Sequence, residues 1–387
     1  MRIGVGERRA RLATRHHLVP VSADVVEVVR DLVALHATDP STVHLSTWAR
    51  VRDATPDTLA RALYDERTLV RLLGMRRTMF VVPVELVPVV QAACTRAIAE
   101  VERRKTEAFL LQHDPDRDVA AFLREVEAEA LAALSEGDAL STEVSARAPR
   151  LAEKITFRVG NAPPGSQSVA SRVLPQLAMD GLAVRGRPRG TWTSSQYLWS
   201  TMTAWLPDGV PDLDPAAART ELARRWLRAF GPAPVADLKW WSGWTVAQTK
   251  AALAGLDVAE VDLDGAPGVA LADDLAPAPT PTPYAALLPA LDPTVMGWKQ
   301  REWFLGPHAP ALFDTNGNAG PTVWWDGRVV GGWAQRRSGE VVLRLLEDVG
   351  ADAADAVEAC RAGLEEWIGP VRVTPRFRTP LERELTA

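Results

Sequence analysis

Residues 68–83 read TLVRLLGMRRTMFVVP, and this stretch predicts a β-hairpin. Apolar and β-branched residues dominate its two halves, 68–73 and 78–83, as is typical of paired strands. The connection between the halves is short and cationic, consisting of Gly74, Met75, Arg76 and Arg77. The sequence therefore predicts a hairpin with two adjacent positive charges at its tip.

Three helices are predicted before this hairpin. The first covers residues 22–37, because Ser22 can cap it and an apolar stripe at helical spacing ends at His36. The second begins at Pro40 with Asp39 as its cap and runs to about residue 50, and the third spans 56–65. Three helices followed by a basic-tipped hairpin is the plan of a winged helix.

The same plan recurs twice along the chain. The second copy has helices over 119–134, 141–150 and 168–179, with Gly181 as the last stop signal. Its hairpin pairs 182–185 with 191–194 through a tip rich in Arg and Gly. A fainter third copy contains Trp240, Trp241 and Trp244, for which core packing is favoured over base stacking, and consists of helices 215–230, 234–242 and 245–256 and strands 258–262 and 269–271.

The C-terminal part changes from helices to strands. Asp326 and Gly327 predict a tight hairpin between strands 322–325 and 329–333. One helix over 353–368 and a last strand over 371–374 complete a small antiparallel β-barrel. The predicted fold is α+β, with three tandem winged-helix units and this barrel, divided as 1–115, 116–205, 206–275, a Pro-rich linker at 276–283, and 284–387.

Composition excludes several classes of protein. The 387 residues are 47% hydrophobic and 24% charged, but no apolar run reaches the roughly 20 residues that a membrane span needs. The two cysteines, Cys94 and Cys360, exclude a disulfide framework and a thiolate zinc site. The first twelve residues lack an export signal, which predicts a cytoplasmic protein. No metal or other cofactor is predicted, and no metal-binding spacing is found among His16, His17, His44, His113 and His308.

Positive charge is concentrated although the net charge is −5. Residues 140–192 carry eight positive and three negative charges, so a basic face is expected on an acidic protein. This pattern favours a DNA partner, and its alternative is an ordinary solvated surface. The residues predicted from charge and position to contact DNA are Arg76, Arg77, Arg147, Arg150, Lys154, Arg172, Arg187 and Arg189.

Motifs spread over the whole chain carry a family resemblance. They are LHATDP at 35–40, GMRRTMF at 74–80, LLPALDP at 287–293, and the segments 298–303, 316–320 and 324–335. In this order the chain resembles the AlkZ and YcaQ-like winged-helix DNA glycosylases. The resemblance also adds Trp298 and Arg301 as DNA contacts, with core packing as the alternative for Trp298.

This resemblance implies a fold and an activity. The expected fold is a C-shaped body around double-stranded DNA, acting as a monomer near the nucleoid. The expected activity is excision of purines alkylated at N7, including bulky genotoxin adducts or crosslinks, in base excision repair or antibiotic self-resistance. The family carries Gln-x-Gln or Gln-x-Asp at the first helix junction, and the matching residues here are His36 and Thr38.

His36, Thr38 and Asp39 are therefore the candidate catalytic residues. An N7-alkylated purine is a cationic leaving group, so the enzyme mainly has to place a water and stabilise the sugar cation. A neutral imidazole can accept a proton from this water, and the Thr38 hydroxyl can hold it. The alternatives are a core histidine at residue 36 and a plain helix cap at Asp39. If His36 is a core residue and Asp39 a plain cap, the sequence predicts a non-catalytic DNA-binding protein, lesion-binding protein or regulator.

Overall fold

The first unit contains a small sheet that presents the loop at residues 36–39. The computed structural model describes residues 1–160 and 162–387. Strand β1 pairs with β3, and β3 pairs with β2, all antiparallel. The apolar sides of these strands and of the preceding helices form one core, from Val25 to Val81. The elements are α1 (Val5–Arg15), α2 (Val25–Asp31), β1 (Leu35–His36), α3 (Pro40–Trp48), α4 (Pro56–Ala60), η1 (Arg61–Asp65), β2 (Leu69–Leu73), η2 (Met75–Arg77) and β3 (Met79–Pro83).

The first predicted helix was too long, and this changes where His36 lies. Helix α2 ends at Asp31, and Val33 then adopts a left-handed conformation with φ of 65°. The chain continues as β1, where His36 is the partner of Phe80 on β3. Leu32, Leu35 and His36 are all buried, so the pattern of inward-facing residues continued although the helix had ended. His36 is therefore a strand residue and not the end of a helix.

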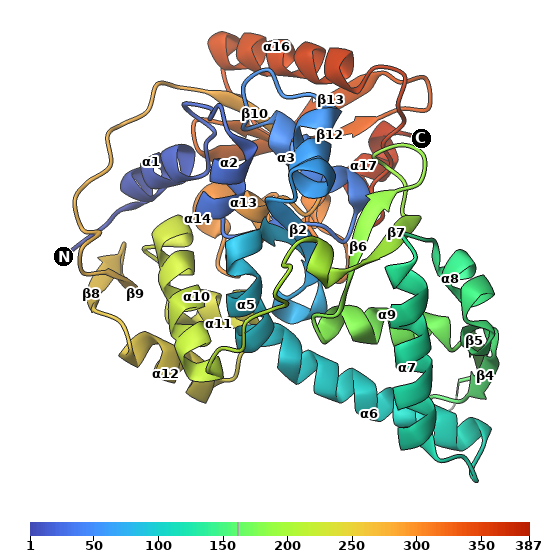
Figure 1. Cartoon of the computed structure of the whole chain (residues 1–387). Helices are drawn as coiled ribbons and strands as arrows, with labels where there is room; N and C mark the ends of the chain where they lie inside the picture. Colours follow the sequence, from blue (N-terminus) through green and yellow to red (C-terminus); the bar gives the residue numbers. More distant parts are fainter. Residues whose placement is uncertain (161) are drawn as a thin grey trace.

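The second unit forms a lobe with its own core, joined to the rest through α6 (Figure 1). Its predicted hairpin is displaced, because Thr191 begins a turn and the second strand starts at Tyr197. A further hairpin, β4 with β5, was not predicted. The elements are η3 (Val84–Leu86), α5 (Val87–Val90), η4 (Gln91–Thr95), α6 (Arg96–His113), α7 (Val119–Ser135), α8 (Ser141–Arg147), η5 (Pro149–Ala152), β4 (Lys154–Phe157), β5 (Gly165–Ser168), α9 (Ala170–Met179), β6 (Ala183–Pro188), β7 (Tyr197–Thr201) and η6 (Met202–Ala204).

The third unit has three helices and a hairpin in the predicted order: α10 (Pro215–Phe230), α11 (Val235–Ser242), α12 (Val246–Ala254), β8 (Val258–Leu263) and β9 (Ala266–Leu271). Beyond β9 the Pro-rich segment runs along α1 to the C-terminal part (Figure 1). It is held there because Arg11 donates to the carbonyl of Ala276 and Glu7 accepts from the backbone of Ala278. The third unit, α1 and the C-terminal part share one continuous apolar core.

The C-terminal sheet is open, which corrects the predicted barrel. Its four described strands follow the order β10-β11-β12-β13, and α16 packs against β10 and β13. Residues 371–374 do not form a strand, since the backbone of Val373 donates to the side chain of Gln335. The elements are β10 (Ala285–Leu288), α13 (Pro293–Met296), α14 (Glu302–Leu305), α15 (Ala309–Leu312), β11 (Thr322–Trp325), β12 (Arg328–Gln335), β13 (Val341–Leu345), α16 (Ala351–Ile368) and α17 (Pro380–Leu385).

Candidate functional site

His36 lies at the start of the loop that joins β1 to α3. Its side chain is 4% exposed, and its ring meets Phe80 edge-on with 5.1 Å between the ring centroids. Burial, and then the charge of Arg76, lowers the pKa of His36 to about 3. Nδ1 accepts a long hydrogen bond of 3.5 Å from the backbone of Thr38, which leaves the ring proton on Nε2. At neutral pH this imidazole is uncharged and presents a donor at Nε2.

Thr38 and Asp39 continue the loop and differ in burial and in the number of hydrogen bonds that they accept. Thr38 is half-buried, and its Oγ1 accepts from the backbone of Met79 at 3.4 Å. Asp39 is buried, and Oδ1 accepts from the backbone and hydroxyl of Ser41 at 2.9 and 2.6 Å. Its Oδ2 accepts from the backbone of Arg376 at 2.8 Å. Asp39 is thus the cap of α3 and ties the C-terminal segment to it.

Two arginines distant in sequence meet beside this loop. Arg76, with φ of 52° at the tip of the β2–β3 hairpin, lies 4.0 Å above the ring of Trp240. Arg301 lies 5.2 Å from the same ring and 4.6 Å from Phe313. Burial lowers the pKa of each guanidinium to about 10, and Arg301 further lowers that of Arg76. Neither forms an ion pair within residues 1–160 and 162–387, and Nε of Arg76 is buried without a partner.

This arrangement suits an anion next to His36. Arg76 lacks a carboxylate partner and retains donors for an oxyanion, whereas Arg301 has long contacts to the carbonyls of Lys299 and Val295 and is attracted by Glu302 and Asp237. A phosphate matches the planar geometry of a guanidinium. Trp240 packs against the main apolar core, as predicted, and its half-buried ring also supports both arginines. Sequence could not reveal this role, because the two arginines stand 225 positions apart and only the fold brings them to one ring.

The described part of the chain holds no cluster of three or more His, Cys, Asp or Glu suited to a metal ion. Among the same residues, none of the helices combines the length and apolar character that crossing a bilayer requires.

Comparison with known proteins gives the family. The family model described as DNA glycosylase AlkZ-like matches residues 29–367. This chain belongs to the AlkZ-like DNA glycosylase family. Among solved structures, it is similar to the DNA glycosylase AlkZ of Streptomyces sahachiroi, with a TM-score of 0.72 and 21% identity over 97% of this chain and 100% of that one. No curated protein matches.

Several predicted DNA contacts of this AlkZ-like chain already have partners within the protein. Arg187 pairs with Asp65 and Arg189 with Glu143, each at 2.6 Å. The remaining contacts of this set are Arg77 to Glu102, Arg150 to Glu125 and Glu129, Arg147 to the carbonyls of Ala133 and Gly137, and Arg172 over Phe109, whereas Lys154 is exposed on β4. The sequence gives the charge of each of these residues, but only the fold shows which group each one contacts.

Trp298 does not face a DNA surface. It is 2% exposed, and its Nε1 donates to the carbonyl of Phe230 at 3.0 Å. The ring stacks on His16 with 5.7 Å between centroids. The predicted DNA contact is therefore corrected to a core position, because the ring fills the space between the third unit and the C-terminal part of the AlkZ-like fold.

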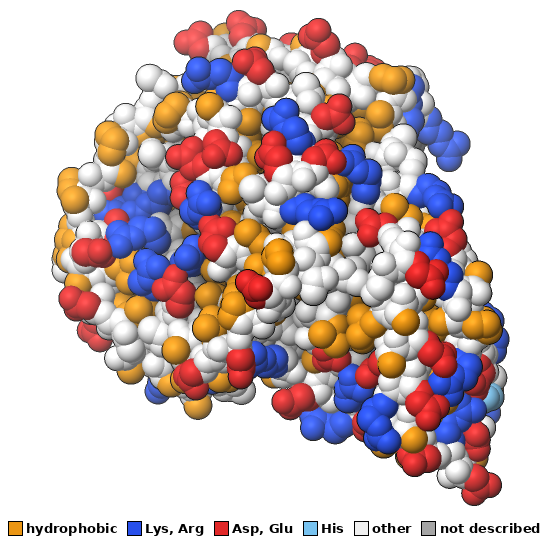
Figure 2. Space-filling view, viewed as in Figure 1, with side chains coloured by type: hydrophobic (Ala, Val, Ile, Leu, Met, Phe, Trp, Pro, Cys, Tyr) orange, Lys and Arg blue, Asp and Glu red, His pale blue; other side chains and the backbone are white. Residues whose placement is uncertain are grey.

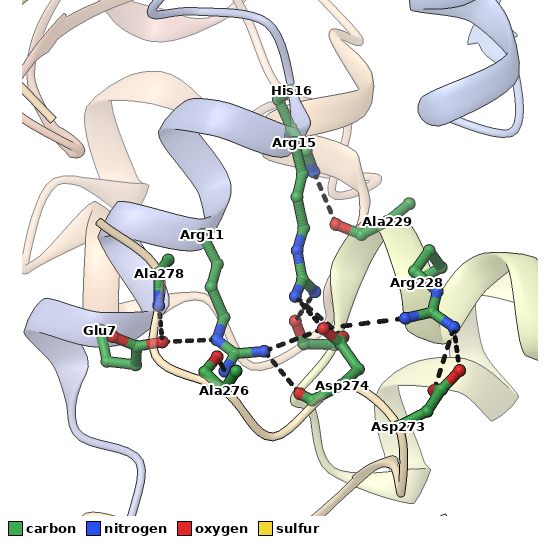
Figure 3. A network of polar contacts seen from close by, with 11 residues as sticks. Glu7, Arg11, Arg15, His16, Arg228, Ala229, Asp273, Asp274, Ala276 and Ala278 are labelled. Carbon is green, nitrogen blue, oxygen red and sulfur yellow. Dashed lines mark hydrogen bonds and ion pairs between the residues drawn. The ribbon is translucent and has the colours of Figure 1, made fainter. Parts of the chain in front are cut away.

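A basic hollow lies between α1, α2 and α10, where Lys and Arg side chains gather in Figure 2. Five arginines and two aspartates line this cavity of about 380 Å³. Its charges are largely compensated: Arg15 pairs with Asp274 and Arg228 with Asp273 (Figure 3). This network connects α1 to the third unit, and we assign it a structural role in this family member.

Proposed function

We propose that this protein releases N7-alkylated purines from duplex DNA by hydrolysing their N-glycosidic bond. Membership of the AlkZ-like DNA glycosylase family supports the reaction class. The observation that carries the assignment of the site is the pair of guanidinium groups, Arg76 and Arg301, that share the ring of Trp240, with the charge of Arg76 acting on His36. We assign them to a phosphate of the damaged strand, which they would hold next to the reacting sugar.

The chemistry of the loop favours a substrate whose leaving group needs no proton. His36, with a pKa of about 3, is not protonated at neutral pH and cannot act as a general acid. The carboxylate of Asp39 accepts three hydrogen bonds from the protein. An N7-alkylated purine is already cationic, so the electron pair of the broken C1′–N9 bond neutralises it as it departs.

His36 and Thr38 would then place the water. Nε2 of His36 donates to the oxygen of this water, and Oγ1 of Thr38 accepts one of its protons, which turns a lone pair toward C1′. The water forms the new C1′–O bond and loses its proton to solvent. The role of His36 is therefore to orient the water, whereas the sequence suggested that it accepts a proton. The negative charge of Asp39 stabilises the sugar cation that develops as the bond breaks.

The alternative function is binding of lesions or DNA without catalysis. The near-complete burial of His36 and the absence of the family's leading Gln favour it. The deciding experiment incubates the protein with duplex DNA that contains one N7-methylguanine and measures abasic sites by alkaline cleavage. We expect base release from this duplex and none from a duplex containing hypoxanthine, whose departure requires protonation. Binding of the lesion without release would leave the alternative.

Variants of residue 36 test the proposed role. Replacing His36 with Ala should slow base release about 100-fold, since both the donor and the fixed water are lost. Replacing His36 with Gln should retain most of the activity, because an amide also donates and matches the residue that relatives carry. Duplex binding should be unchanged in both. Equal rates for the wild type and the Ala variant would remove His36 from the mechanism.

A further inference from the structure

Three more arginines lie near Tyr197 and the loop at residues 36–39. They come from distant parts of the chain: Arg71 from β2, Arg185 from β6 and Arg376 from the segment before α17. The guanidinium of Arg71 lies 4.7 Å from the ring of Tyr197. Burial, and then repulsion by Arg71 and Arg376, lowers the pKa of Arg185, so the three positive charges lie close together.

The protein compensates this cluster only in part, since Tyr197 and Tyr64 raise the pKa of Arg71 against the effect of its burial. Arg71 is 3% exposed, and its Nη1 donates to the carbonyl of Ala37 at 3.1 Å, but its Nε is buried without a partner. In the described ranges, no ion pair is formed by any of the three guanidinium groups. Asp39 lies close by, but it carries one charge against three and already accepts bonds from Ser41 and Arg376, while Glu102 on the same cavity is paired with Arg77.

Further donors face the same place. The hydroxyl of Tyr197 is buried without a partner in the described structure, and the buried hydroxyl of Tyr64 faces the guanidinium of Arg71. Burying an unpaired cation or hydroxyl costs free energy unless something in the working state satisfies it. Apart from Asp39, these groups supply positive charge and O–H donors, so an anion with several acceptor oxygens would satisfy them.

An anion can enter beside them. Arg71 and Arg185 line a cavity of about 190 Å³ whose other walls are mainly apolar, apart from the ion pair of Arg77 and Glu102. Arg185 and Tyr197 also line a second cavity, of about 340 Å³, across the β6–β7 hairpin. Arg185 thus borders both openings, and an apolar wall beside a cation suits a sugar attached to a phosphate.

We infer that Arg71, Arg185 and Arg376, together with Tyr197, bind a phosphate of the DNA strand that carries the lesion. This inference rests on the proposed function for the identity of the strand. Arg71 donates to the carbonyl of Ala37, and the backbone of Arg376 donates to Asp39, so the cluster adjoins the same loop as His36, whose pKa the charge of Arg76 lowers. The strand would then be held at two phosphates near the damaged nucleotide.

The test measures affinity for undamaged duplex as a function of salt, which needs no base release. Replacing both Arg185 and Arg376 with Gln should weaken binding and lower the slope of log affinity against log salt by about 1 to 2. Arg344, paired with Glu384 at 2.6 Å, provides a matched control, and its change to Gln should leave the slope unchanged. These three positions avoid the buried Arg71, whose loss endangers folding.

A second arm separates DNA from a small anion. The wild type and the double variant are titrated with inorganic pyrophosphate while thermal unfolding is followed. Pyrophosphate that protects only the wild type, with an unchanged duplex slope in the variant, would overturn the strand assignment. A wild type that does not bind duplex would overturn it as well. A changed slope in a protein that releases no base would retain this site and refute the proposed function.

Discussion

Three histidines are buried in the described structure, and each is held neutral. His16 and His44, like His36, are almost completely inaccessible. Burial lowers the pKa of His36 and of His44 to about 3 and that of His16 well below its ordinary value. His16 is hydrogen-bonded by Thr294 and by a backbone carbonyl, whereas Nδ1 of His44 has no partner. None of these rings can be protonated at mild acidity without loss of packing.

These histidines predict a loss of stability in mild acid. Below pH 6.5 the unfolded chain binds protons that the folded chain excludes, so the free energy of unfolding decreases as the pH falls toward 3. Each histidine contributes about 1.4 kcal/mol per pH unit in this window. Urea unfolding of the wild type and of His44→Gln at pH 7, 6 and 5 would check this. The variant should show the shallower decrease, and parallel curves would contradict the neutral state of His44.

At the scale of elements, the β2–β3 hairpin tip is positioned by a glycine of another unit. Gly243 ends α11 with φ of 78°, and a Cβ there would meet the backbone of Arg76 at 3.3 Å. Gly190, with φ of 91°, has open space around it. Gly190→Ala should cost about 1 kcal/mol, from the backbone alone. Gly243→Ala should cost more and also weaken duplex binding by displacing Arg76, as urea unfolding and a binding titration would show. Equal effects of the two changes would exclude this contact.

Local sequence patterns predicted individual helices, strands and turns better than they predicted contacts between residues far apart in the chain. The hairpin at 68–83 and the tight turn at Asp326 and Gly327 were confirmed, since strand propensity and turn chemistry are properties of short segments. His36 was misplaced because β1 has two residues and is defined by its pairing with β3. The compensation of Arg187 by Asp65 joins residues 122 positions apart, and no local pattern contains it. For the same reason Arg71, Arg185 and Arg376 were missed.

At the scale of the whole molecule, the C-terminal part anchors α3 at both ends. Asp39 at the start of α3 accepts from the backbone of Arg376. Just past its end, Arg50 forms an ion pair with Asp292 at 2.6 Å, and both side chains are 0% exposed. Arg50 also donates to Ser46 and Thr294, so the pair is fully hydrogen-bonded. The motif LLPALDP, which contains Asp292, thus contributes to the assembly of the fold.

This pair predicts that the units unfold together. Asp292→Asn leaves the charge of Arg50 buried without compensation, which should cost about 3 to 5 kcal/mol of unfolding free energy. Replacing both Arg50 with Met and Asp292 with Leu removes both charges, so the double change should cost less than the sum of the single changes. Denaturant unfolding followed by tryptophan fluorescence and by circular dichroism would measure the costs of the single and double changes.

Because the apolar core of the C-terminal part is continuous with that of α1 and α10, the fluorescence and circular dichroism signals of the wild type should change together. Additive costs would show that Arg50 and Asp292 are not coupled. Two separate transitions would show that the C-terminal part folds on its own and does not set the position of the loop at 36–39.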